Sequence, residues 1–450
     1  MNRKTISLLK LAVCMAFVMT LLICTAAPSL ATYGTINSQG ALVGTEQNPA
    51  DAAITKIFSK GQGTATPSAT FKFKFDPVSI DDDPDLADLM PNIPDAVITY
   101  NSSDTVTSSQ LAWNANQTDY MPKQTQPIFK NINWGRSGIF LYEVYEEQSG
   151  VTITDSSRQT VYYSQAVYEI AVYVVEKENQ PGFYVWAIGA TRTVTDTGST
   201  TGSEIGKVDP RPDGDPAKPE LGKYSKLIFS NNYLKHGSGD PDDPKDMMLK
   251  VSKTTKGLGS NSSLFFNFSI TIEKPIISQK TVYTVYVFQT PIGGGSPEQL
   301  TSSELQEIAS SYVKSGGYLE LPTGQPVSFK LKHNQYLSFV DMDEGATYKV
   351  TEQAATDYTP SYQLTINGAM GNKVNGTQGQ SLPMTSAITI TSGKDEAAFT
   401  NTYKTITPTG IAVDDLPYYA AIAIAVIGLG GYLFYRIRSR KENEVAVEAN

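Results

Sequence analysis

Lysine, glutamate and asparagine recur in the same order in the two halves of this chain, each in a segment with the composition of a β-strand. The two sets are Lys56, Glu146 and Asn231 in the first half, and Lys253, Glu352 and Asn401 in the second. One set alone would be weak evidence. A second set in the same order indicates that the two halves repeat the same arrangement of reactive residues, and not only the same hydrophobic pattern.

The alternation of residues in these segments predicts that all six side chains point inward, because alternate residues of a strand share a face. Leu249, Val251 and Lys253 point the same way, so Lys253 is expected in the core and Lys250 in solvent. The same parity turns the two glutamates and the two asparagines toward apolar neighbours. Each half is therefore expected to bury one lysine, one glutamate and one asparagine.

Burial makes this set of residue types reactive. Desolvation disfavours charge, so it lowers the pKa of a lysine and raises that of a glutamate. A neutral lysine amine is a nucleophile, and a protonated glutamate can polarise the asparagine amide and carry protons as ammonia leaves. The predicted product is a Lys–Asn isopeptide bond, formed once without turnover, with Glu146 and Glu352 as its catalytic groups. A buried salt bridge beside an asparagine, or a solvated strand end, is the alternative that leaves the residues unreacted.

Cysteine usage agrees with a crosslink of another kind. Both cysteines, Cys14 and Cys24, lie in the first 31 residues, so the rest of the chain has no disulfide. The only histidines are His236 and His333, which argues against a histidine metal site or a catalytic triad. We therefore expect no metal, no cofactor and no enzyme with turnover.

The composition predicts an all-β protein, since the chain is rich in Tyr, Thr, Val and Phe. Phe71, Phe73 and Phe75 alternate with lysines, as in a half-buried strand, and residues 168–175 and 183–188 flank a turn and predict a long hairpin. One helix is expected over residues 303–314, capped by Thr301 or a neighbouring serine. The net charge of −9 and a pI near 5.0 argue against nucleic-acid partners.

The two ends of the chain predict export and anchoring. Basic residues, an apolar run and the small residues before position 31 are typical of a signal peptide over residues 1–31; a lipoprotein signal ending at Cys24 is the alternative. Near the other end, residues 418–435 are uncharged and long enough to cross a membrane, and residues 436–450 begin with a basic cluster that stays inside.

A short motif precedes that apolar segment. It consists of Ile406, Thr407, Pro408, Thr409 and Gly410. A Pro-Thr-Gly element followed by a spacer, an apolar span and a basic tail resembles the cell-wall sorting signal that sortase transpeptidases cut between Thr409 and Gly410. Pro408 directly precedes Thr409, as in streptococcal FctA-type backbone pilins, which implies a pilin-specific sortase.

The isopeptide sets resemble the same family, the backbone (major) pilins with isopeptide-linkage domains, over almost the whole exported chain. The resemblance implies two tandem Ig-like, CnaB-like β-sandwiches. The predicted segments are a first domain over residues 32–235, a linker over residues 236–247 and a second domain over residues 248–405. Residues 195–222 are poor in core residues and are expected to form a surface excursion of the first domain.

The resemblance also implies a role: a cell-wall-anchored, sortase-assembled pilus subunit that supports adhesion. Its implied partners are the sortase, other copies of the chain, accessory pilins and peptidoglycan, with the host ligand unknown. The lysine that accepts the Thr409 acyl group of the next subunit would be Lys223, with Lys226 in reserve. A wall-anchored adhesin or accessory pilin that does not polymerise is the alternative. A secreted enzyme would need a catalytic constellation that the sequence does not show.

Overall fold

The computed structural model describes residues 33–106, 118–212, 224–237, 239–240, 243–404 and 416–447. The predicted signal peptide, the predicted sorting motif and the candidate acceptor Lys223 lie outside these ranges. The chain forms two compact units. Unit 1 comprises Met1–Gly237 with Glu273–Lys280 and Asp343–Thr347, and unit 2 comprises Ser238–Ile272, Thr281–Met342 and Tyr348–Asn450.

The described residues of unit 1 form two β-sheets. In spatial order the larger sheet contains β1 (Thr35–Ile36), β2 (Leu42–Val43), β10 (Phe183–Val194), β9 (Val167–Glu176), β7 (Gly138–Glu146), β4 (Ala69–Ile80) and β5 (Ala96–Tyr100), with β11 (Gly206–Val208) paired to β10. The smaller sheet contains β6 (Thr118–Gln124), β3 (Ile54–Gly61), β12 (Leu227–Lys235) and β8 (Gln159–Tyr162). A short 3-10 helix, η1 (Pro84–Leu89), follows β4.

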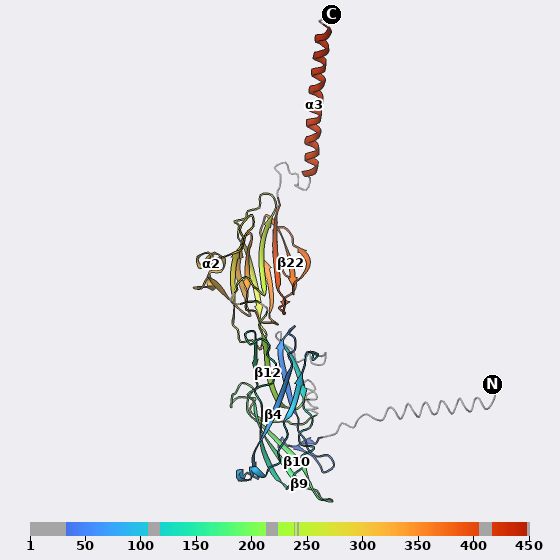
Figure 1. Cartoon of the computed structure of the whole chain (residues 1–450), viewed down its shortest axis with the longest axis vertical. Coiled ribbons are helices and arrows are strands. Elements are labelled where there is room, and N and C mark those ends of the chain that lie inside the picture. Colours follow the sequence, from blue (N-terminus) through green and yellow to red (C-terminus); the bar gives the residue numbers. More distant parts are fainter. Residues whose placement is uncertain are drawn as a thin grey trace, which may run out of the picture. The chain divides into compact units, whose positions relative to one another are not determined.

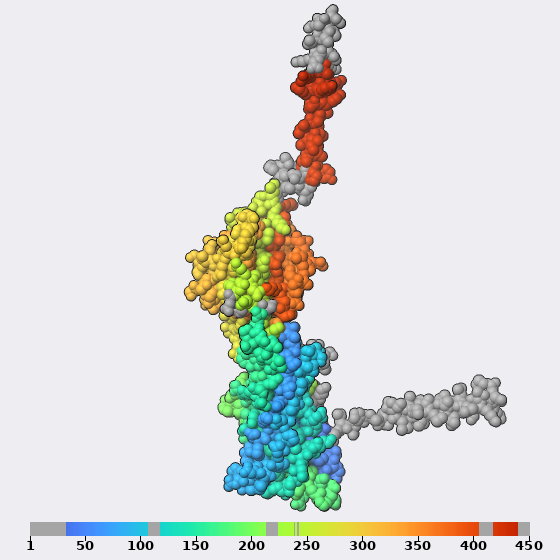
Figure 2. All heavy atoms as spheres, in the orientation of Figure 1, coloured from blue at the N-terminus to red at the C-terminus, as the bar shows by residue number. Residues whose placement is uncertain are grey.

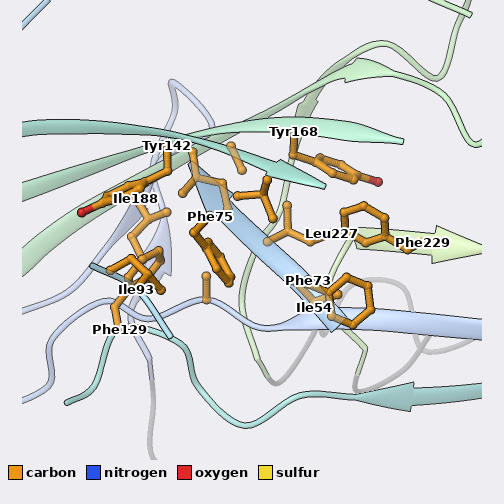
Figure 3. Close-up of a cluster of buried hydrophobic side chains, with 14 of the residues drawn as sticks. Ile54, Phe73, Phe75, Ile93, Phe129, Tyr142, Tyr168, Ile188, Leu227 and Phe229 are labelled. Carbon is orange, nitrogen blue, oxygen red and sulfur yellow. The ribbon is translucent and has the colours of Figure 1, made fainter. Parts of the chain in front are cut away.

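The core of unit 1 lies between these sheets, as Figure 3 shows. In β4 the side chains of Phe71, Phe73 and Phe75 are buried while the lysines between them face outward, as the alternation predicted. Phe73 packs against Phe229 of β12, with 5.0 Å between ring centroids, so side chains of the two sheets meet in one apolar layer. This is the packing of a β-sandwich.

The predicted hairpin is confirmed: β9 and β10 pair antiparallel with Phe183 opposite Glu176 (Figure 1). The predicted excursion that follows β10 is only partly irregular. Its residues Gly206–Val208 form β11, which pairs with Ala190–Arg192.

Unit 2 also has two sheets in its described residues. The larger contains β17 (Val313–Lys314), β18 (Tyr318–Pro322), β15 (Val282–Gln289), β20 (Gln335–Phe339), β13 (Leu249–Lys256), β26 (Asp395–Tyr403), β22 (Tyr358–Ile366) and β23 (Ala369–Asn375), with β16 (Glu298–Gln299) paired to β15. The smaller contains β19 (Pro326–Leu331), β14 (Phe266–Glu273), β21 (Thr347–Glu352) and β24 (Leu382–Pro383), with β25 (Ile388–Thr389) paired to β21. Phe268 of β14 packs against Phe399 of β26 at 5.3 Å, so this unit is a sandwich too. The all-β prediction is confirmed.

The helix predicted over residues 303–314 is wrong at its C-terminal end. Helix α2 covers Ser302–Ala309, with Thr301 and Glu304 forming a capping box at its start. The chain then makes a 3-10 turn, η3 (Ser310–Tyr312), and Val313 pairs with Leu319 as part of β17. Two serines and a β-branched valine have low helix propensity, and pairing with β18 gives the backbone of Val313–Lys314 its hydrogen bonds instead.

The C-terminal helix α3 (Leu416–Val447) contains the predicted apolar segment and continues beyond it. Residues Pro417–Ser439 are long and apolar enough to cross a membrane, with a mean hydropathy of 1.8. Their side chains are uncovered within this chain, as the red segment of Figure 2 shows. An apolar helix of this length is suited to lipid.

Candidate functional site

In each unit, the strand that carries the lysine lies beside the strand that carries the asparagine, and the two run parallel. In unit 1, β3 pairs with β12 so that Lys56 lies opposite Phe229. In unit 2, β13 pairs with β26 so that Lys253 lies opposite Phe399. The asparagine follows that phenylalanine by two residues in both units. Because alternate residues share a face, the lysine and asparagine point into the same core.

The glutamate comes from the facing sheet. Glu146 ends β7 of the larger sheet of unit 1, opposite Phe73 of β4 in the strand register. Glu352 ends β21 in the smaller sheet of unit 2. The packing of one sheet on the other therefore brings the glutamate to the lysine and asparagine. The structure brings together the three predicted residues of each set.

The first site is fully buried. Lys56 Nζ donates to Glu146 Oε2 at 2.5 Å, and both side chains have no exposed surface. Asn231 Nδ2 donates to the other carboxylate oxygen, Oε1. The carbonyl oxygen of the same asparagine, Oδ1, accepts the backbone N–H of Ser164 at 2.6 Å. Every polar group of this set thus has a partner.

The second site differs in its hydrogen bonds. Lys253 Nζ and Asn401 Nδ2 both donate to Glu352 Oε1, at 2.6 and 2.7 Å. Among the described residues, neither Glu352 Oε2 nor Asn401 Oδ1 has a hydrogen-bond partner. The lysine and glutamate side chains are again fully buried.

An aromatic ring lies against the amine of each lysine. Lys56 Nζ lies 4.5 Å from the centroid of the Phe71 ring, and Lys253 Nζ lies 4.1 Å from that of Phe266. Burial lowers the pKa of each lysine to about 8, although the glutamate beside it opposes this effect. Burial also raises the pKa of Glu146 and of Glu352 against the attraction of the lysine. The two shifts favour transfer of a proton from lysine to glutamate.

Three residues around Asn231 had no place in the sequence prediction. One is Ser164, whose backbone N–H donates to the asparagine. The other two are Arg192 and Asp196, which form an ion pair with 2.7 Å between Nη2 and Oδ2. A signal for the pair exists in β10, where Arg192 shares the inward parity of Ile188 and Ala190. An inward arginine needs a carboxylate, and Asp196 is four residues on.

Of the two predicted polymerisation lysines, the structure describes Lys226. It lies just before β12, partly exposed, and its backbone N–H donates to the carbonyl oxygen of Asp209 at 2.8 Å. In the described part of the chain, no group of three or more His, Asp or Glu side chains is arranged to hold a metal ion.

Comparison with known proteins adds a relative of nearly full length. Residues 247–403 match a family model described as a domain of unknown function (DUF7601). A pilin of Streptococcus pyogenes serotype M1 is 23% identical over 394 residues, which cover 86% of this chain and 90% of that protein. This chain is similar to the streptococcal pilins. The resemblance that the motifs indicated is thereby confirmed.

Solved pilin structures also match. The major pilin from Streptococcus pyogenes is 20% identical, over 78% of this chain and 99% of that one, at a TM-score of 0.28. The major pilin protein T-13 from the same species is 16% identical, over 81% of this chain and 99% of that one, at a TM-score of 0.26. TM-scores this low carry no weight, so the likeness to pilins rests on the sequence.

Proposed function

We propose that this chain is a structural subunit of a covalently assembled surface pilus and that each of its two β-sandwiches is locked by an isopeptide bond. The bonds join Lys56 to Asn231 and Lys253 to Asn401. The observation that carries the bonds is the duplicated geometry: in both units a buried lysine and asparagine on neighbouring parallel strands share a glutamate from the facing sheet. Similarity to a streptococcal pilin supports the pilus role.

The reaction begins with a proton transfer inside the buried pair. The lysine ammonium gives one proton to the glutamate, since the neutral pair is better suited to an apolar site than two charges. The free amine attacks Cγ of the asparagine, which is polarised by its contacts. A nitrogen–carbon bond forms and the bond from Cγ to Nδ2 breaks. The glutamate gives its proton to the leaving nitrogen and takes one proton from the attacking nitrogen in exchange. One amine and one amide give one secondary amide and ammonia.

Each site reacts once, so the chain is not an enzyme with turnover. The benefit of the bond is stability. Closing a loop of about 175 residues between Lys56 and Asn231 removes unfolded-state entropy worth about 5 kcal/mol. The bond in unit 1 would also join β3 directly to β12, so a pulling force on the chain would pass through covalent bonds without unfolding the strands between them. That is useful in a fibre whose exported residues contain no cysteine.

Assembly uses the C-terminal signal. A pilin-specific sortase cuts between Thr409 and Gly410 while α3 holds the precursor in the membrane, and joins the Thr409 carboxyl to an amine. In the fibre that amine is Lys223, with Lys226 in reserve, of another copy of this chain; at the base it belongs to peptidoglycan. The proposed organisation places the domains at residues 32–235 and 248–405.

Mass analysis of peptides from the purified full chain tests the proposal. We expect one crosslinked peptide pair containing Lys56 and Asn231 and another containing Lys253 and Asn401, each lighter than its two linear peptides by one ammonia molecule. Linear peptides alone, at full mass, would reject the internal bonds. A single crosslinked pair would reject the bond in the other unit.

A further inference from the structure

The two crosslinking sites differ at the oxygen where negative charge develops. When a lysine amine attacks the asparagine, the amide oxygen Oδ1 becomes an oxyanion, and a hydrogen-bond donor held against it lowers the barrier. Asn231 Oδ1 already receives the backbone N–H of Ser164 at 2.6 Å. Asn401 Oδ1 receives no donor from the described residues.

We propose that the backbone N–H of Ser164 is the oxyanion donor of the first site and that Asp196 is the positioning residue that holds it there. This inference rests on the proposed isopeptide function and adds a fourth group to its Lys–Glu–Asn set. It concerns unit 1 alone, because in unit 2 the corresponding oxygen, Asn401 Oδ1, accepts no hydrogen bond from the described residues.

The contacts of Asp196 explain how it positions the donor. Its Oδ1 accepts the hydroxyl of Ser164 at 2.5 Å and the backbone N–H of Ser230, the residue before Asn231, at 2.8 Å. Its own carbonyl oxygen accepts the backbone N–H of Gln165 at 3.0 Å. One aspartate thus ties the Ser164 segment directly to the strand that carries Asn231.

A charged pair keeps that aspartate in place. Arg192 Nη2 donates to Asp196 Oδ2 at 2.7 Å, while Nη1 of the same arginine donates to Glu204 Oε2 at 3.2 Å. The Arg192 side chain is nine-tenths buried, whereas that of Glu204 is mostly exposed. Asp196 therefore holds the Ser164 segment in position, whereas the hydrogen-bond partner of Glu204 is Arg192.

Strand lengths explain why only the first site has this donor. β8 pairs with β12 only over Asn232–Lys235, so among the described residues no strand pairs with the first five residues of β12 on the side away from β3. There, Tyr168 Oη accepts the backbone N–H of Ile228, and Asp196 Oδ1 accepts that of Ser230. The backbone N–H of Ser164 donates to Asn231 on the same side. In unit 2 the neighbouring strand β22 runs past the asparagine and places Pro360, which has no N–H, opposite Asn401.

The test measures the rate of each bond separately in the full chain. Cells receive a pulse of heavy lysine and then a chase, samples are denatured at intervals, and peptides are quantified with and without the Lys56–Asn231 and Lys253–Asn401 crosslinks. The rate of the second bond serves as the internal reference, because the substitutions lie in unit 1. Asp196→Ala should slow the first bond about tenfold or more, less than the full loss of an oxyanion donor, and leave the second unchanged. The matched control, Glu204→Ala, should leave both rates unchanged.

A conservative variant separates positioning from charge. Asp196→Asn keeps an oxygen that can accept from Ser164 and Ser230, so it should recover most of the rate. Ser164→Ala removes only the hydroxyl anchor, keeps the N–H, and should slow the first bond by a smaller factor, which provides a test if Asp196→Ala does not fold.

Several results would overturn the inference. An unchanged first bond in Asp196→Ala, an equal slowing of both bonds, or an Asp196→Asn chain as slow as Asp196→Ala would each do so while the proposed function stands. If the unaltered chain shows no crosslinked peptide at either site, the proposed function fails and this inference fails with it.

Discussion

Lys253 and Asn401 donate to the same carboxylate oxygen, Oε1 of Glu352, at 2.6 and 2.7 Å. The nucleophile and the amide it would attack are therefore held at one acid, with the lysine on β13 and the asparagine on its parallel neighbour β26. In unit 1 the carboxylate of Glu146 instead uses one oxygen for each partner. Both arrangements let one glutamate serve as base toward the amine and as acid toward the leaving group.

Removing a glutamate should prevent the bond in its own unit. In Glu146→Ala the buried Lys56 has no proton acceptor, so the first bond should be absent while the second forms normally. Peptide mass analysis of the full chain checks both. Glu143→Ala, an exposed change on the same strand, is the control and should retain both bonds. A first bond that still forms in Glu146→Ala would contradict the catalytic role.

Removing a lysine should lower stability. Lys253→Ala cannot form the second bond. That bond would close a loop of about 148 residues, and the entropy it removes from the unfolded state stabilises the fold by about 5 kcal/mol. Denaturant unfolding, followed by a probe of unit 2, should show a loss of that order. Lys250→Ala, on the outer face of the same strand, loses a partly exposed pair with Glu396 and a contact with the Tyr336 ring, and should cost at most about 2 kcal/mol. Equal effects of the two changes would argue against a bond at Lys253.

Blocking the second bond at its asparagine should introduce a pH dependence. In Asn401→Ala the amine of Lys253 stays free, and burial lowers its pKa from 10.5 to about 8. Between these values the unfolded state binds more protons than the folded state, so stability should rise with pH over roughly 8 to 10.5. In the unaltered chain the proposed bond makes this nitrogen part of an amide, which does not titrate. Chemical denaturation across this pH range measures the difference, and equal slopes in the two chains would contradict the prediction.

The proposed polymerisation requires an acceptor lysine. When the chain is produced with its sortase, a ladder of covalent multimers is expected on a denaturing gel. Lys223→Ala should remove the ladder, and Lys226→Ala should leave it intact. Loss of the ladder only in Lys226→Ala would assign the acceptor to the reserve lysine. Monomer alone in the unaltered chain would favour a wall-anchored adhesin or accessory pilin that does not polymerise.

The proposed wall anchoring requires the sorting motif. Thr409→Ala removes the residue whose carboxyl is transferred, so the chain should stay in the membrane fraction through α3 and be absent from the cell-wall fraction. Immunoblots of the two fractions check this. Thr407→Ala, a change in the motif outside the Pro-Thr-Gly element, is the control and should keep wall attachment. Wall attachment of Thr409→Ala would show that the motif is not the anchor.

Much of the fold and the inward direction of the six key side chains could be predicted from the sequence, because both depend on local geometry. Successive side chains of a strand alternate between faces, so apolar neighbours such as Leu249 and Val251 predict where Lys253 points. The helix end could not be placed in this way. Val313 is in a strand because its backbone pairs with Leu319 of β18. That pairing exists only in the folded sheet, so the local sequence does not predict it.

The sequence alone determined the residue types, their order and their parity, since these follow from covalent connectivity and the two-residue repeat of a strand. Only the tertiary structure decided which groups meet across the core. Strand register set Lys56 opposite Phe229, two residues before Asn231 on the same face of the sheet, and sheet packing brought Glu146 to both side chains. Because β8 ends at Tyr162, the backbone N–H of Ser164 can reach Asn231. The second site has the same three residue types, yet β22 covers its flank and Asn401 Oδ1 lacks a donor among the described residues. Residues far apart in the chain can place hydrogen bonds to within a few tenths of an ångström only once the whole sandwich has fixed their register.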